Sequence, residues 1–471
     1  MSEIKILLKN FSSSAIGTLL GQIINFFTLL YLPRVLGPDG YGIFSFSQSL
    51  AMYFLLFADL GLSLYCIRNV NQKEESEVEN EITSIFSMKI ILSIISTIGF
   101  ILIAMLFNGS NLERKSLFFM SFSILGTGIF IDYIFNSLNN MKYIGISVAI
   151  KNTIFFILCI SFIKDIKQTY LVALFYSLGI IISSLFLIFI FKKTNFKLKF
   201  RKVKLKEFNI IKASIPLAIS LFMVQINNNF DIIYLSATKN QDIVGYYSAP
   251  YKIINFLIAI LCIYFNAAYP TIAKLIKNNK EDLNKYIYKF YYIGVVFIFP
   301  IVFGGIVLNK DIIMLLFGSK FAESEMIFVL LLPLILIRMI TSTFGSVLIM
   351  GEGSKLFSRA VFMGASINIL LNIILVPRYE AEGAALATLI CEISQGILLY
   401  IYFRKYCDTK IFKCNIIPLI SSSIMVIFLI NLKLNNLFLK IFLGAIVYLI
   451  SIVIIYFIIN PKMLKKLNIN K

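Results

Sequence analysis

Asp231 lies in the most polar patch of any apolar stretch in this sequence. Gln225, Asn228 and Asp231 follow one another at three-residue spacing, so in a helix their side chains share one face. An ionisable side chain inside an apolar stretch is typical of an ion or proton pathway. The face therefore predicts a site for a polar ligand or a coupling cation. Hydrogen bonding between neighbouring helices is the other interpretation.

Further acids lie in other apolar stretches, at Asp59, Asp132 and Glu392. The same two interpretations apply to them, because an acid in a membrane either serves an ion pathway or pairs with a neighbouring base. Together with Asp231 they are the candidates for ion coupling.

Basic side chains also occur inside or beside apolar stretches. Arginine keeps its charge and binds phosphate through two parallel hydrogen bonds, whereas lysine acts as a point charge. Such residues favour an anionic cargo. The main candidates are Arg34, Arg68, Lys252 and Arg338, followed by Lys89 and Lys151. Arg68 is equally well interpreted as an anchor at the end of its stretch.

Composition excludes several classes of protein. The 471 residues are 59% hydrophobic and 14% charged, and the mean hydropathy is +0.87, values that only an integral membrane protein reaches. In a membrane protein, a net charge of +20 reflects the orientation of the chain in the membrane and its contact with anionic lipid headgroups, so no nucleic-acid partner is expected. The sequence has no histidine, and its six cysteines form no C-x-x-C pair. No catalytic residue, metal site or cofactor is therefore expected.

The elements that must position these residues are transmembrane helices. A hydrocarbon core requires about 20 apolar residues per helix. The sequence predicts fourteen spans, near 11–32, 42–66, 83–107, 116–138, 144–163, 169–191, 213–236, 246–270, 286–308, 325–349, 358–377, 383–403, 415–431 and 437–459. Pro377 and Gly383 mark the predicted break between the eleventh and twelfth.

Basic residues are distributed unevenly between the two sets of alternate loops. One set, which includes both termini, has 28 lysines and arginines, and the other has 10. By the positive-inside rule both termini are expected on the cytoplasmic side. The short loops leave no room for a catalytic domain outside the membrane.

An internal repeat divides the predicted spans into two lobes. Residues 22–45 align without a gap on residues 225–248, with nine identities among 24 positions. Gln22 and Asn25 match Gln225 and Asn228. The offset of 203 residues equals six spans, which predicts a parallel repeat about an axis along the membrane normal. The expected domains are 1–191 (first lobe), 192–212 (basic cytoplasmic linker), 213–404 (second lobe) and 405–471 (helix pair and tail).

Three motifs resemble one known family. Residues 34–42 (RVLGPDGYG) are similar to its R-x-L-G-P-x-x-Y-G loop, and residues 59–62 (DLGL) with Arg68 to its D-L-G-L…R element. Residues 368–392 resemble its N-x-x-L-N…P-x-Y-G-x-x-G-A-A-x-A-T…E signature, although Glu380 and Glu382 replace a glycine and an apolar residue. The family is the polysaccharide-lipid flippases, Wzx-type exporters of O-antigen or capsule repeat units within the multidrug/oligosaccharidyl-lipid/polysaccharide exporter superfamily.

The resemblance implies the fold and the cargo. It implies an all-α polytopic membrane protein of two six-helix lobes and a C-terminal pair, located in a bacterial cytoplasmic membrane. The implied cargo is an oligosaccharide on undecaprenyl diphosphate, which is flipped outward by alternating access. Arg34, Arg68, Lys252 and Arg338 would then bind the diphosphate, and Gln22, Asn25, Gln225 and Asn228 the sugars.

The resemblance also implies partners and leaves alternatives. Membrane lipids, a polysaccharide polymerase and chain-length machinery are the expected partners, and in related flippases the last two helices cradle the lipid tail. A cation-coupled drug or metabolite antiporter of the same superfamily and a lipid-linked peptidoglycan precursor flippase are the alternative functions. A membrane polymerase or ligase is disfavoured because the outward loops are short.

Overall fold

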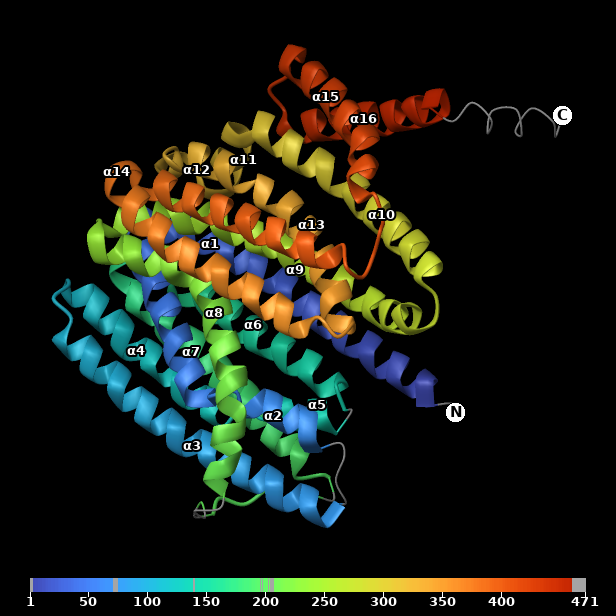
Figure 1. The fold of residues 1–471 in the computed structure, drawn as a ribbon. Helices are drawn as coiled ribbons and strands as arrows, with labels where there is room; N and C mark the ends of the chain where they lie inside the picture. The colour runs from blue at the N-terminus through green and yellow to red at the C-terminus, as the bar shows by residue number, and fades with distance from the viewer. Residues whose placement is uncertain are drawn as a thin grey trace. The chain divides into compact units, whose positions relative to one another are not determined.

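The computed structural model describes residues 3–459, except 71–74, 139, 195, 197, 202 and 204–206. Every element in this part of the chain is a helix (Figure 1). Helices suit these apolar sequences because each backbone N–H and C=O group is then hydrogen-bonded within its own segment, as hydrocarbon requires. Parts of the predicted linker 192–212, and residues 460–471 of the predicted tail, lie outside the described residues.

Within the described residues, twelve helical stretches are long and apolar enough to span a membrane. Two of them contain a kink: α1 (Glu3–Asp59) at Gly37 and α14 (Ser354–Phe403) at Glu380. A straight helix of 57 residues would be roughly 85 Å long, far beyond the hydrocarbon thickness of about 30 Å. Each kinked helix therefore provides two spans, and the total is fourteen, consistent with the prediction.

The internal contacts of the chain divide it into two compact units. Unit 1 comprises residues 1–249 and 372–381, and unit 2 comprises residues 250–371 and 382–471. Unit 1 thus includes the seventh predicted span in addition to the first six. The division into lobes 1–191 and 213–404 follows the sequence repeat instead and stays a prediction.

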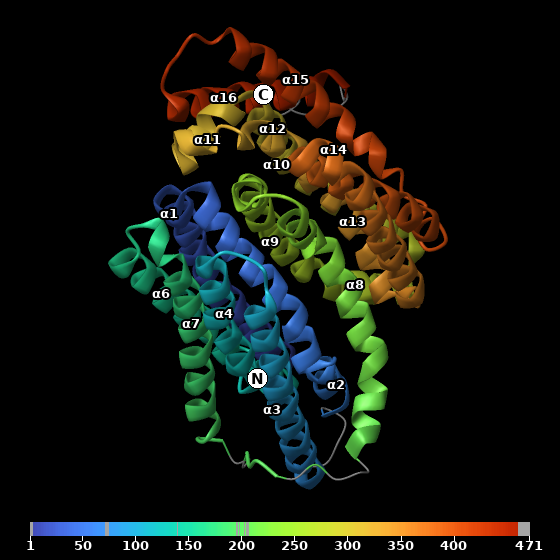
Figure 2. The ribbon, with the colours of Figure 1, turned by 90° about the vertical axis from the view of Figure 1, so that its left-hand side faces the viewer.

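The helices of unit 1 pack mainly around α1. In Figure 2, α1, α3, α4, α6 and α7 lie side by side. Small residues allow close approach: a Cβ at Gly17 of α1 would lie 2.6 Å from the backbone of Gly145 in α6. The helices after α1 are α2 (Leu62–Asn69), α3 (Glu75–Leu106), α4 (Asn111–Gly128), α5 (Asp132–Ser137), α6 (Lys142–Phe162), α7 (Thr169–Phe191) and α8 (Phe208–Thr238).

Unit 2 contains the remaining spans. α9 (Gln241–Asn278) begins in unit 1 and continues here, and α14 contributes most of its length. Helices α15 and α16 pack against each other and against α10, as the red and yellow ribbons of Figure 1 show. The other helices are α10 (Lys280–Val307), α11 (Asn309–Phe317), α12 (Ser324–Leu331), α13 (Pro333–Met350), α15 (Ile416–Asn431) and α16 (Leu437–Ile459).

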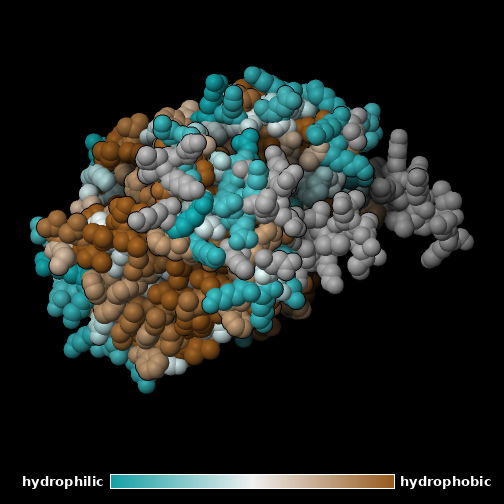
Figure 3. Space-filling model, turned by 90° about the horizontal axis from the view of Figure 1, so that it is seen from below, coloured by the Kyte–Doolittle hydropathy of each residue, from teal (hydrophilic) through white to brown (hydrophobic). Residues whose placement is uncertain are grey.

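Large apolar side chains cover much of the surface. Figure 3 shows one face of the molecule, on which hydrophobic residues form a broad area bordered by hydrophilic ones. Leu106 and Ile430, for example, are 79% and 68% exposed. A protein in water does not present this much apolar surface, so these side chains are the ones that face lipid.

Candidate functional site

The carboxylate of Asp231 is completely buried in unit 1 and is held by two neutral donors. Tyr247 Oη, from the start of α9, donates to Oδ2 at 2.8 Å. Asn372 Nδ2, from α14, donates to Oδ1 at 2.5 Å. Both of these donors are uncharged, and they orient the two carboxylate oxygens. A carboxylate in such a place can bind a small cation or a proton.

Asp231 thus lies at a meeting point of three helices. The three-residue spacing predicts its neighbours on α8, and Gln225 and Asn228 are indeed half-buried there. The backbone carbonyl of Gln225 also accepts a hydrogen bond from Tyr53 Oη of α1, at 3.4 Å. The partners Tyr247 and Asn372 are not evident from the sequence, since Asn372 is 141 residues away from Asp231.

The equivalent face of α1 has no charge. Gln22 and Asn25 are half-buried, and Thr28 occupies the position that Asp231 has in the second copy. Thr28 is completely buried and donates its hydroxyl hydrogen to the carbonyl of Ile24 in its own helix, at 3.2 Å. This face can contact polar groups but cannot bind a cation by charge.

A second charged centre joins Asp59 to Lys89 at 2.9 Å. Lys89 Nζ also donates to Ser63 Oγ at 2.8 Å, and Ser63 Oγ donates to Asp59 Oδ1 at 2.5 Å. The ammonium lies 4.1 Å from the ring centre of Tyr133. Asp59 therefore pairs with a base, the second of the two interpretations of membrane acids. Asp132 is half-buried at the start of α5.

Asp59 also supports the turn between α1 and α2. Leu60 and Gly61 both have positive φ, 43° and 77°. This conformation is unfavourable for leucine, by about 1–2 kcal/mol, whereas glycine adopts it freely. The backbone N–H of Ser63 donates to Asp59 Oδ2 at 3.4 Å and so bridges the turn. The D-L-G-L motif is thus a helix break held by its own first residue.

A third charged pair lies in unit 2, where Arg338 of α13 contacts Glu392 of α14 at 2.6 Å. The side chain of Glu392 is 1% exposed and that of Arg338 is 27% exposed. A buried pair of this kind fixes both groups in place. The sequence predicts a diphosphate-binding role for Arg338 and an ion-coupling role for Glu392, and the structure pairs the two side chains.

The remaining cationic candidates are distributed over both units. Arg34 is exposed on α1 just before the Gly37 kink, and Arg68 is exposed in the last turn of α2. Lys252 is half-buried on α9. Arg34 and Arg68 belong to unit 1, Lys252 and Arg338 to unit 2. Their convergence on one substrate stays a prediction.

Sequence reasoning missed a polar cavity of about 630 Å³ in unit 1. Asp39, Glu113 and Asp242 line it, at the kink of α1 and at the first turns of α4 and α9. Gln241 Nε2 donates to Glu113 Oε1 at 2.7 Å and ties α9 to α4. The repeat could have indicated this cavity, because Asp39 and Asp242 are equivalent acids in its two copies. Among the described residues, no three acidic or cysteine side chains converge as metal ligands would.

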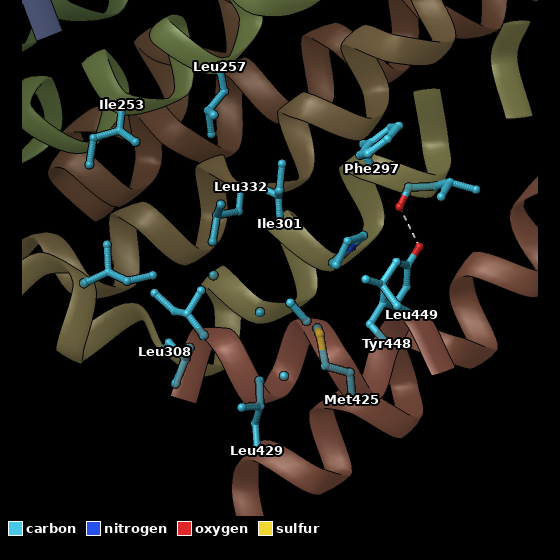
Figure 4. Close-up of a pocket in the computed structure, with 18 of the residues that line it drawn as sticks. Ile253, Leu257, Phe297, Ile301, Leu308, Leu332, Met425, Leu429, Tyr448 and Leu449 are labelled. Carbon is cyan, nitrogen blue, oxygen red and sulfur yellow. Dashed lines mark hydrogen bonds between the residues drawn. The ribbon is translucent and has the colours of Figure 1, made fainter. Parts of the chain in front are cut away.

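An apolar cavity of about 510 Å³ lies in unit 2, where α15 and α16 meet α9 to α12 (Figure 4). Met425 and Leu429 line it on one side, and Leu308 and Leu332 on the other. Tyr448 Oη donates to the carbonyl of Val296 at 2.7 Å, so its polar end is satisfied at the wall. Gly304 and Gly305 of α10 also line this cavity.

The break in α14 falls at Glu380, between Pro377 and Gly383, which mark the predicted break. Glu380 has φ 49°, a left-handed conformation that favours glycine, at the position where the resembling family has glycine. Its carboxylate pairs with Lys239 Nζ at 3.0 Å. This ion pair holds the turn in place of a glycine.

Comparisons with known proteins agree with this fold. The family described as Polysaccharide biosynthesis protein matches residues 7–276, more than half of the chain. The capsular polysaccharide biosynthesis protein CapF of Staphylococcus aureus is 25% identical over 416 residues, which cover 85% of this chain and 99% of CapF. A protein of Escherichia coli (strain K12) named as an O-antigen transporter is 22% identical, with 80% of this chain and 92% of that protein covered.

Solved structures extend the likeness to nearly the whole chain. The lipid II flippase MurJ in an inward-closed conformation matches with a TM-score of 0.78 and 16% identity, covering 96% of this chain and 99% of MurJ. An inward-facing multidrug resistance MATE transporter matches with a TM-score of 0.64 and 12% identity, covering 87% and 99%. At such identities these structures show the fold alone. The family match and the fourteen spans show that the chain is a multi-pass membrane protein that belongs to the polysaccharide biosynthesis protein family.

Proposed function

We propose that the protein flips oligosaccharides linked to undecaprenyl diphosphate from the cytoplasmic to the outer face of a bacterial cytoplasmic membrane, for surface polysaccharide synthesis. The family match over residues 7–276 is the observation that carries this proposal. The names of the O-antigen and capsule relatives support the same kind of cargo. The positive-inside distribution supports cytoplasmic termini.

The charged residues suit an anionic cargo that crosses by alternating access. Diphosphate is prohibitively unstable in hydrocarbon without fixed cations. We assign this role to Arg34, Arg68, Lys252 and Arg338. Glu392 holds the guanidinium of Arg338 in one position, which favours a defined phosphate geometry.

The sugars would contact Gln22, Asn25, Gln225 and Asn228, because these half-buried amides can both donate and accept hydrogen bonds. Asp231 would couple transport to a cation or a proton, because it is a completely buried carboxylate within an apolar helix. Asp59, Asp132 and Glu392 are secondary candidates for coupling, and two of them are already paired with bases.

The apolar cavity of unit 2 suits a prenyl chain. It is lined almost entirely by aliphatic and aromatic side chains of α9–α12, α15 and α16. Gly304 borders the cavity with room for a larger side chain, since a Cβ there would meet its nearest neighbour, Met425, at 3.5 Å. Gly304→Leu should fill part of the cavity and reduce export of long-chain carriers. A prenyl photoprobe that labels α15 and α16 equally in the parent and in Gly304→Leu would contradict this role.

A strain that lacks the gene tests the proposed function. We expect loss of surface polysaccharide and a build-up of complete, unpolymerised repeat units on undecaprenyl diphosphate in the inner leaflet. Lys252→Ala should fail to restore export although the protein accumulates in the membrane. The proposed polymerase and chain-length partners are tested in strains that keep this gene and lack one partner gene, which should make no polymer or polymer of altered length.

A drug antiporter is the alternative function, because the fold is also similar to that of a MATE transporter. Intact surface polymer with altered resistance to cationic dyes in the deletion strain would favour it. We propose no bond-breaking step in either case.

A further inference from the structure

The two copies of the repeat touch each other through glycine. A Cβ built on Gly42 of α1 would overlap the carbonyl oxygen of Gln241 at the start of α9. A Cβ built on Gly245 of α9 would overlap the carbonyl oxygen of Pro38 in α1 and lie 2.6 Å from its carbon. Both glycines therefore pack directly against backbone of the other helix, in a contact that lies wholly within unit 1.

This contact is reciprocal under the repeat. The offset of 203 residues relates Gly42 to Gly245, and the same offset relates Pro38 to Gln241. The residue that Gly42 meets, Gln241, is thus the repeat equivalent of Pro38, the residue that Gly245 meets. Such an isologous contact arises when a two-fold axis passes between the two segments. The pseudo-two-fold axis implied by the sequence repeat therefore runs between Gly42 and Gly245.

The surroundings of the contact belong to the predicted outer side of the membrane. Asp39 and Asp242, another equivalent pair, line the polar cavity beside it together with Glu113. One turn further along each helix, Ser45 and Ser248 are equivalent and completely buried. Both serines thus lie behind the glycine contact, shielded from solvent.

A separate contact closes the opposite end of the same segment. A Cβ at Gly61, in the turn after α1, would lie 2.7 Å from the carbonyl oxygen of Ser214 and 2.9 Å from the backbone nitrogen of Ala218 in α8. The segment of α1 after its kink is therefore held by backbone packing at both ends. Its outer end contacts α9, and its predicted cytoplasmic end contacts α8.

We propose that the reciprocal Gly42–Gly245 contact is the outer gate of the transport path, a backbone seal that must part when cargo leaves on the outer side. This proposal rests on the proposed function, because a gate requires a transported cargo. Glycine is needed at both positions, since any side chain there holds the two helices apart. The Gly61 contact then serves as the inner seal.

Accessibility of a buried thiol tests the gate without any cargo. Ser248→Cys places a thiol just behind the seal, and a membrane-impermeant maleimide is applied to intact cells. Adding Gly42→Ala or Gly245→Ala should raise its labelling by about tenfold, the population shift that about 1.4 kcal/mol of destabilisation of the closed gate produces. The chain without Ser248→Cys measures background from the native cysteines.

Gly99→Ala is the matched control, because a Cβ there would meet its nearest neighbour at an ordinary 3.5 Å. It should leave labelling unchanged. Unchanged labelling in Gly42→Ala and Gly245→Ala, with both proteins in the membrane at the parent level, would overturn the gate. A rise in labelling in a protein whose deletion leaves surface polymer intact would instead keep the gate and reject the proposed function.

A second measurement tests the gate if the Gly42→Ala and Gly245→Ala proteins do not accumulate in the membrane. Glu113 and Gln241, joined by a hydrogen bond, link α4 to α9 beside the seal. With Glu113→Cys and Gln241→Cys together, a short thiol cross-linker should lock the gate and stop export until the link is reduced. Cross-linked protein that exports at the parent rate, or two reactive thiols that never cross-link, would contradict the proposal.

Discussion

The two copies of the repeat, residues 22–45 and 225–248, share a glycine where their backbones touch and differ in charge at one buried polar position. The glycines Gly42 and Gly245 are identical and pack reciprocally on each other's helices. Further along, Thr28 of the first copy bonds to its own helix, whereas Asp231 of the second is held by Tyr247 and Asn372. Contact across the axis thus constrains both copies alike, and polar chemistry is free to differ.

This difference makes the molecule asymmetric in charge. The first copy has a neutral polar face, and the second has a buried carboxylate that Tyr247 and Asn372 orient. The charge of Asp59 in the first half of the chain is already paired with Lys89. The asymmetry favours Asp231 as the coupling site.

The largest expected effect comes from removing the charge that distinguishes the copies. Asp231→Asn should abolish the dependence of export on sodium or pH, because an amide has nearly the same shape but carries no charge to bind a cation or a proton. The measurement is export in membrane vesicles across a series of sodium and proton gradients. The equivalent change in the first copy, Thr28→Asn, is the control and should keep the dependence. An unchanged dependence in Asp231→Asn would reject the coupling role.

Breaking the Asp59–Lys89 pair should have the next largest effect. Lys89→Met leaves a largely buried carboxylate without its cation, which should destabilise the protein by about 3–5 kcal/mol. Thermal unfolding in detergent measures this. The double variant Lys89→Met with Asp59→Asn should recover most of the loss. A single variant as stable as the parent would show that the pair contributes nothing.

A smaller effect is expected from the neutral counterpart of Asp231. Thr28→Val removes one hydrogen bond within α1 and keeps the side-chain shape, so the change in stability should be only about 0.6 kcal/mol. Export and its ion dependence should persist. Loss of export in Thr28→Val would mean that the first copy has a chemical role equal to that of the second.

The smallest expected effect on stability comes from the break in α14, where the carboxylate of Glu380 pairs with Lys239. Glu380→Gly relieves a left-handed backbone but removes the Lys239 ion pair, which is exposed at the Glu380 end. Relief is worth about 1–2 kcal/mol and an exposed pair about 0–1 kcal/mol, so a slight rise in thermal stability is expected. A clear fall in stability would show that the ion pair, rather than the backbone, determines this turn.

The sequence alone predicts much of this molecule because its signals are local. Apolar runs predict the fourteen spans, and the repeat predicts which residues are equivalent. The family resemblance is confirmed by the match over residues 7–276. The lobe boundaries and the roles of the candidate site residues stay predictions.

The side-chain partners could not be predicted in this way. Asn372 reaches Asp231 across 141 residues, and Glu392 reaches Arg338 from another helix. Such pairs depend on helix packing, which hydrophobic periodicity does not specify. The break in α14 falls between Pro377 and Gly383, as predicted, but the ion pair of Glu380 with Lys239 at this break was not evident from the sequence.

The most direct test of the central claim is transport by the purified protein. The full chain is reconstituted in vesicles that contain a fluorescent oligosaccharide on undecaprenyl diphosphate, and a sugar-oxidising enzyme outside the vesicles reports the outer leaflet. We predict that active protein exposes the inner-leaflet pool, and that Lys252→Ala, reconstituted at equal density, does not. Equal exposure in protein-free vesicles and in vesicles with the parent chain, under all ion gradients, would contradict the account.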